Sequence, residues 1–109
     1  MGKVSRLWET WHACNVLYFG GKLKAPEAIV ITRAKGYDGK LHVTVSEHGR
    51  ILRNKIYISA HTRDTLGTLL HEMVHQYQAF VLDDEELDHG PTFRPFAKYL
   101  ERVTRLRIR

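Results

Sequence analysis

The spacing of apolar residues predicts three amphipathic helices. In residues 4–18, and again in residues 63–81, apolar side chains recur every three or four positions, which places them on one face of a helix. The face of the first helix comprises Val4, Leu7, Trp8, Trp11, Cys14 and Tyr18. The face of the second comprises Leu66, Leu69, Leu70, Met73, Val74, Tyr77 and Val81. Gly20 and Gly21 are expected to end the first helix, and Thr62 is the expected N-cap of the second.

A third helix is expected to start near Pro91 or Thr92, because Pro95 is tolerated only in a first turn. Its predicted buried face comprises Phe93, Phe96, Ala97, Leu100 and Val103. Residues 104–109 alternate polar with apolar side chains, a pattern compatible with a helix, a strand or an extended tail.

Between the first two helices the pattern changes to that of strands. Residues 28–32 form a short apolar run, and the apolar residues of 41–45 and 56–58 alternate with polar ones, which is the period of a half-buried sheet. The second and third strands are expected to pair antiparallel, because their connection is too short for a crossover. The sequence therefore predicts an α+β fold with a small three-stranded sheet, as one domain over residues 1–109.

Composition and charge narrow the class of protein. Hydrophobic residues make up 43% of the chain and charged residues 27%, which is typical of a globular domain and unlike a disordered one. No apolar run approaches the roughly 20 residues that span a bilayer, and no secretory signal is recognisable, so we expect a cytoplasmic protein, or a nuclear one in a eukaryote. Cys14 is the only cysteine, which excludes an intrachain disulfide and a cysteine-based zinc site. The net charge of +5 is compatible with a polyanionic partner.

The second helix carries the residues with the clearest chemistry, His71-Glu72-Met73-Val74-His75. Two histidines four apart leave a helix in nearly the same direction, so both imidazoles can bind one metal ion. Imidazole nitrogen suits zinc, and Glu72 points aside from the two ligands, where it can accept a proton from water. This HExxH pattern predicts a zinc hydrolase.

A catalytic zinc requires a third protein ligand. A histidine at position 81 would indicate a metzincin, but that residue is Val81. His89, just before the third helix, is the preferred candidate, and Glu85, Glu86 and Glu101 remain as carboxylate alternatives. Two further roles are left open by the sequence. One is the group that orients a ligand imidazole, and the other is the hydrogen-bond donor that stabilises the negative oxygen formed during hydrolysis. Candidates for the first role are Asp83, Asp88 and nearby groups, and for the second Tyr37, Arg94 and Tyr99.

Two motifs in order resemble a known family. HExxH at residues 71–75, followed by His89-Gly90-Pro91-Thr92-Phe93, resembles the HExxH and HGxxF signatures of the SprT-like metallopeptidases, relatives of Spartan. The stretches Asn15–Leu23 and Thr68–Leu70 are also similar to the family's sequence. The resemblance implies a zincin-like domain with Zn²⁺ held by His71, His75 and His89, and with Glu72 as general base. It further implies a protease that cleaves polypeptides bound or crosslinked to DNA.

The C-terminal region adds a candidate nucleic-acid surface. If the third helix continues, basic residues recur at spacings of three and four and could follow phosphates. They are Arg94, Lys98, Arg102, Arg105 and Arg109. Two rival interpretations stay open: a non-catalytic nucleic-acid-binding module with a structural metal, and a zinc hydrolase of non-peptide substrates. Oligomeric state cannot be predicted from the sequence.

Overall fold

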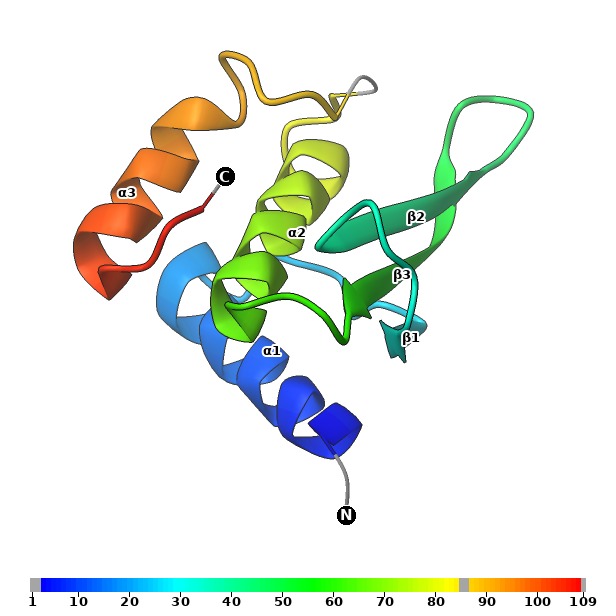
Figure 1. Ribbon diagram of the computed structural model, residues 1–109. Coiled ribbons are helices and arrows are strands. Elements are labelled where there is room, and N and C mark those ends of the chain that lie inside the picture. Colours follow the sequence, from blue (N-terminus) through cyan, green and yellow to red (C-terminus); the bar gives the residue numbers. More distant parts are fainter. Residues whose placement is uncertain (1–2, 85–86, 109) are drawn as a thin grey trace.

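The computed structural model describes residues 3–84 and 87–108 and has the predicted α+β architecture (Figure 1). In chain order, its elements are α1 (Lys3–Phe19), β1 (Ala28–Thr32), β2 (Gly39–Val45), β3 (Ile51–Ser59), α2 (Thr65–Phe80) and α3 (Arg94–Thr104). None of the described helices combines the length and apolarity needed to cross a membrane.

The sheet has the strand order β1-β3-β2. β2 pairs antiparallel with β3, which confirms the predicted pairing, and β1 pairs parallel with β3 on its other side. Ile56 in the central strand lies opposite both Ile29 and Leu41. On β3 the side chains of Asn54, Ile56 and Ile58 are buried, as expected for one covered face of a sheet.

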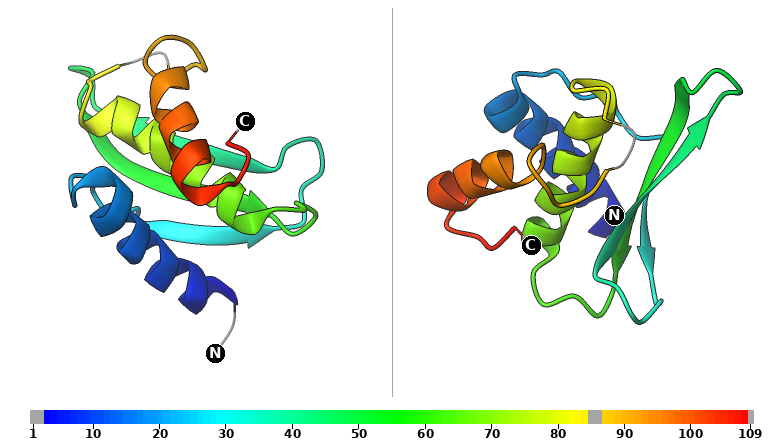
Figure 2. Two further views of the ribbon diagram at one scale, coloured as in Figure 1. Left: turned by 90° about the vertical axis from the view of Figure 1, so that its left-hand side faces the viewer. Right: turned by 90° about the horizontal axis from the view of Figure 1, so that it is seen from above.

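The helices all lie on one side of the sheet, as the right-hand view of Figure 2 shows. α2 is central because it contacts β2, β3, α1 and α3. Its predicted apolar face is largely buried, with Leu69, Leu70, Met73 and Val74 fully enclosed. Leu66 is 39% exposed, because it lies in the first turn at the end of the covered face.

A buried polar network fixes α2 against its neighbours. The Trp11 indole N–H of α1 donates to the Gln76 side-chain oxygen over 2.8 Å, and the Gln76 amide donates to the Asn54 oxygen of β3 over 2.7 Å. The same amide donates to the Lys24 carbonyl over 3.3 Å. Gln76 therefore satisfies its polar atoms in the core, as buried amides must.

The end of α1 agrees with the prediction, whereas the N-cap of α2 differs from it. α1 ends before Gly20 and Gly21, which have φ of 62° and 71°, as predicted. The N-cap of α2 is Asp64, whose carboxylate accepts the Gly67 N–H over 2.8 Å. The prediction of Thr62 was wrong, because its hydroxyl bonds instead with that of Thr68.

α3 begins slightly later than the expected start near Pro91 or Thr92. It begins at Arg94, after a turn at residues 91–93, and ends at Thr104 with Arg105 in the left-handed conformation. Phe93, Ala97 and Leu100 are buried as predicted, whereas Val103 is 48% exposed, because it lies on the outer face of the last turn. The chain beyond the helix is non-helical, and Ile108 packs into the core. Basic residues therefore do not continue along one helix beyond position 102, and Arg109 lies outside the described residues.

Candidate metal centre

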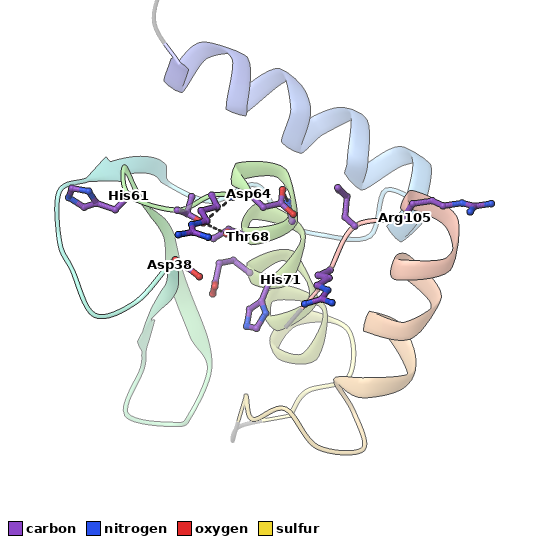
Figure 3. A pocket seen from close by; sticks show the side chains of 13 residues that line it. Asp38, His61, Asp64, Thr68, His71 and Arg105 are labelled. Carbon is purple, nitrogen blue, oxygen red and sulfur yellow. Dashed lines mark hydrogen bonds between the residues drawn. The ribbon is translucent and has the colours of Figure 1, made fainter.

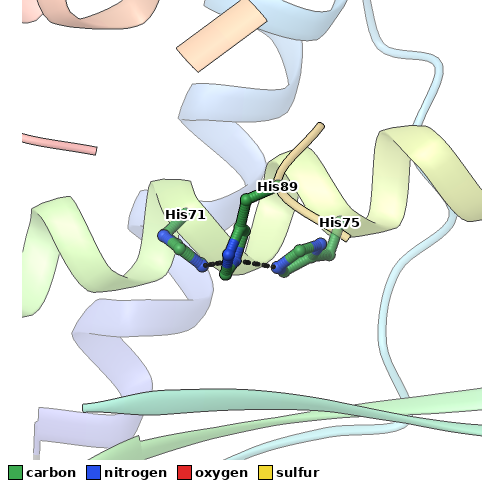
Figure 4. A group of neighbouring side chains, drawn as sticks. All are labelled: His71, His75 and His89. Atoms are coloured by element: carbon green, nitrogen blue, oxygen red, sulfur yellow. Dashed lines mark hydrogen bonds between the residues drawn. The ribbon is translucent and has the colours of Figure 1, made fainter. Parts of the chain in front are cut away.

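Three histidine side chains converge beside α2 (Figure 4). His71 and His75 extend from the same side of the helix, and His89 enters from the loop before α3 and lies between them. The Nε2 atom of His89 is 3.0 Å from that of His71 and 3.2 Å from that of His75. The sequence therefore identified three imidazoles that the fold brings to one point.

Their geometry and protonation fit a divalent metal. Nitrogens bound to a tetrahedral zinc at about 2.0–2.1 Å lie roughly 3.3–3.4 Å apart, close to the separations found here. Burial, reinforced by repulsion from His75 and His89, lowers the pKa of His71 to about 3. Burial also lowers the pKa of His75. The His71 and His75 rings therefore favour the neutral form, which is the form that binds metal.

Phe93 forms an apolar wall against the whole cluster. Its ring centre is 4.8 Å from that of His71, 4.9 Å from that of His75 and 4.7 Å from that of His89. The side chain is only 2% exposed, so it excludes water from one side of the imidazoles. The sequence predicted its burial but not this contact with all three rings.

Glu72 lies next to this cluster, enclosed by the edge strand β2. It is 3% exposed, and burial raises the pKa of its carboxyl group to about 8, although a hydrogen bond from the Leu41 backbone opposes the shift. β2 approaches so closely because residue 39 is glycine. A Cβ there would lie 2.6 Å from Thr68 Cγ2 and 2.9 Å from Glu72 Oε2.

A cleft of about 770 Å³ opens onto His71 and Glu72. Its walls are the start of β2, the first half of α2 with the preceding loop, and residues 105–107. Figure 3 shows Asp38 beside the sheet and His71 on α2, with the Arg105 side chain directed away from His71. None of the candidate oxyanion donors, Tyr37, Arg94 and Tyr99, lines this cleft.

The sequence model of the SprT-like family matches residues 7–109, which is nearly the whole chain. The chain belongs to the SprT-like family. A search of the curated proteins found no match.

In this SprT-like chain the partner of His75 is a neutral amide. The Nδ1 atom of His75 is 2.7 Å from Oε1 of Gln78, which is fully buried three residues along the same helix. Neither of the candidate carboxylates, Asp83 and Asp88, is the hydrogen-bond partner of His75 Nδ1. The charge of Asp88 raises the pKa of His75, but the effect of burial, which lowers it, is larger. The spacing of three residues was the only sequence signal for Gln78.

Of the remaining candidate ligands, the structure describes only Glu101. The Glu101 carboxylate accepts the Ile108 N–H over 3.3 Å and does not join the histidine cluster. Glu85 and Glu86 lie outside the described residues. The other histidines are exposed, and of these His61 lines the cleft. They are His12, His42, His48 and His61.

Proposed function

We propose that this SprT-like chain is a zinc-dependent endopeptidase with Glu72 as its general base. The observation that carries the proposal is the convergence of three imidazoles beside a buried carboxyl group that opens onto a cleft. The proposed ligands are His71, His75 and His89, and the set suits Zn²⁺ because histidine nitrogen is among its preferred donors. The family assignment supports the same chemistry.

A divalent cation bound here would supply Lewis acidity, acidifying a water molecule and polarising the scissile carbonyl. A carboxylate oxygen of Glu72 would accept a proton from the attacking water molecule. At the same time the oxygen of that water molecule would add to the carbonyl carbon. When the C–N bond breaks, Glu72 delivers this proton to the leaving nitrogen. Because burial raises the pKa of Glu72 to about 8, the group can both hold and release a proton near neutral pH.

The polypeptide substrate is proposed to lie extended along β2. This strand is an edge of the sheet, and its first residue, Gly39, lines the cleft together with Glu72. Pairing with an edge strand would bind a peptide through its backbone and so admit varied sequences.

The rival interpretation of a structural metal requires a fourth protein ligand. Among the side chains that the structure describes, the ligand group consists of three histidines. A three-histidine set leaves one tetrahedral position for solvent or substrate, which favours a catalytic site over a structural one.

We also propose that the exposed face of α3 contacts nucleic acid near the substrate. Arg94, Lys98 and Arg102 are exposed and four residues apart, so they extend from the same side of the helix. Basic side chains in such a row can contact successive phosphates and would bring DNA-bound or DNA-crosslinked protein to the cleft.

The test compares the zinc-loaded protein with Glu72→Gln on an unfolded protein substrate, with and without single-stranded DNA. We expect the wild type to cleave and Glu72→Gln to bind zinc without cleaving. Glu101→Gln is the matched control and should do both. Normal cleavage by Glu72→Gln would refute the assigned base, and absence of any peptide cleavage by the wild type would refute the peptidase assignment.

A further inference from the structure

Gln78 makes contacts on both sides of its amide that determine which atom faces which partner. The Asp88 backbone carbonyl, 2.8 Å from the Gln78 nitrogen, can only accept a hydrogen bond. The NH₂ group of Gln78 must therefore face Asp88, and its oxygen must face His75. Since a side-chain amide oxygen only accepts, His75 Nδ1 carries the proton of the 2.7 Å hydrogen bond.

The Gln78 amide nitrogen has a second acceptor, Thr92, which continues the series of hydrogen bonds that begins at His75. Its nitrogen also donates to the Thr92 hydroxyl oxygen over 2.8 Å, and that hydroxyl donates its own proton to the Asp84 carboxylate. All donors thus point one way, from His75 through Gln78 and Thr92 to Asp84. A carboxylate is a pure acceptor, so the end of the chain fixes the direction.

The direction of these hydrogen bonds determines which nitrogen of His75 can bind a metal ion. A neutral imidazole protonated at Nδ1 has its lone pair on Nε2, and Nε2 is the atom of His75 that faces the cluster. The same Gln78 side chain also holds the Asp88 carbonyl, next to His89 in sequence. One buried side chain therefore acts on a ligand of α2 and on the loop that carries the third ligand.

We propose that Gln78, Thr92 and Asp84 form a positioning relay that fixes the metal-binding tautomer of His75 and anchors the loop of His89. The inference rests on the proposed function in so far as the three histidines bind metal. Outer partners of this kind commonly affect metal affinity by about 10–100-fold. Because Gln78 connects two ligands, we place its effect toward the upper end of that range.

The chain contains a matched control for Gln78. Gln76 is also fully buried in α2, but its amide contacts α1, β3 and the Lys24 carbonyl and does not contact the histidines. Gln78→Leu and Gln76→Leu thus remove the same amide from the same helix. Only the first change removes contacts of the metal centre.

The first measurement is the tautomer of His75 in metal-free protein, from two-bond ¹H–¹⁵N NMR correlations. We expect protonation at Nδ1 in the wild type and in Gln76→Leu, and a mixture of tautomers in Gln78→Leu. A wild-type His75 protonated at Nε2 would overturn the relay. Because no metal is present, this result is independent of whether the protein is a peptidase.

The second measurement is Zn²⁺ affinity, by competition with a chromophoric chelator. We expect Gln78→Leu to bind about 100-fold more weakly than wild type, and Gln76→Leu to stay within about threefold. Equal affinities of the two variants would refute the proposal. Failure of the wild type to bind Zn²⁺ would instead refute the proposed function.

Thr92→Val and Thr92→Ser test the relay without altering α2. The valine variant should lose about tenfold in Zn²⁺ affinity, and the serine variant, which keeps the hydroxyl, should recover it. This pair retains the test if Gln78→Leu does not fold. Wild-type affinity in Thr92→Val would exclude Thr92 and Asp84 from the relay and contradict the proposal.

Discussion

The close approach of β2 to Glu72 makes Gly39→Ala a sharp test of how the general base is positioned. The new methyl group would lie 2.6 Å from Thr68 Cγ2 and 2.9 Å from Glu72 Oε2, whereas carbon atoms prefer about 3.5–4.0 Å. The strand or the helix must therefore move by about 1 Å. Overpacking of this kind costs about 1–3 kcal/mol of unfolding free energy, and a displacement of that size at a catalytic group lowers kcat/KM by up to about 100-fold.

A double-mutant cycle with Thr68→Ser separates the two effects. Serine lacks Cγ2, which removes the closest contact, but retains the hydroxyl that bonds with Thr62. In urea denaturation, we expect the double variant to recover part of the stability lost in Gly39→Ala. In a peptide-cleavage assay it should remain impaired, because the contact with Glu72 persists. Wild-type stability and activity in Gly39→Ala would refute the close packing of β2 on the base.

Three further predictions follow from the site and from α3. In metal-free protein, the free energy of unfolding should fall by about 1 kcal/mol between about pH 7 and pH 8, because folded Glu72 keeps a proton that the unfolded chain has lost. Glu72→Gln should flatten this dependence of the unfolding free energy on pH. The same pH dependence in Glu72→Gln and wild type would contradict the raised pKa of Glu72. His89→Ala should weaken Zn²⁺ binding by more than about 100-fold in a chelator competition, since loss of a ligand exceeds loss of its outer partner; a smaller effect would exclude it as a ligand. Replacing Arg94, Lys98 and Arg102 by alanine should reduce the slope of log affinity for single-stranded DNA against log salt by about 2, and an unchanged slope would remove α3 from the interface.

Local patterns predicted the elements of the fold better than their arrangement. The spacing of apolar residues located α1 and α2, because each helix buries one face against the same core. The parallel pairing of β1 with β3 was not predicted, since it depends on where the chain between residues 33 and 38 leads. The start of α3 was predicted slightly too early, because the turn at 91–93 is a local backbone conformation without a strong residue preference, and the sequence left residues 104–109 open among helix, strand and tail.

The metal centre shows the same division between local and tertiary information. His71 and His75 follow from helix geometry alone, and His89 from a motif at a fixed distance along the chain. Gln78 was identifiable in principle from its spacing to His75, but many buried helical glutamines, such as Gln76, serve the core instead. The contact of Glu72 with β2 depends on register between distant segments, which the sequence does not display.

The most direct test of the central claim is X-ray absorption or anomalous diffraction on the zinc-loaded protein. We expect one Zn²⁺ per chain, coordinated by Nε2 of His71, His75 and His89, with one oxygen from solvent in the fourth position. A fourth protein side chain in that position would support a structural metal. Coordination without His89 would contradict the proposed centre.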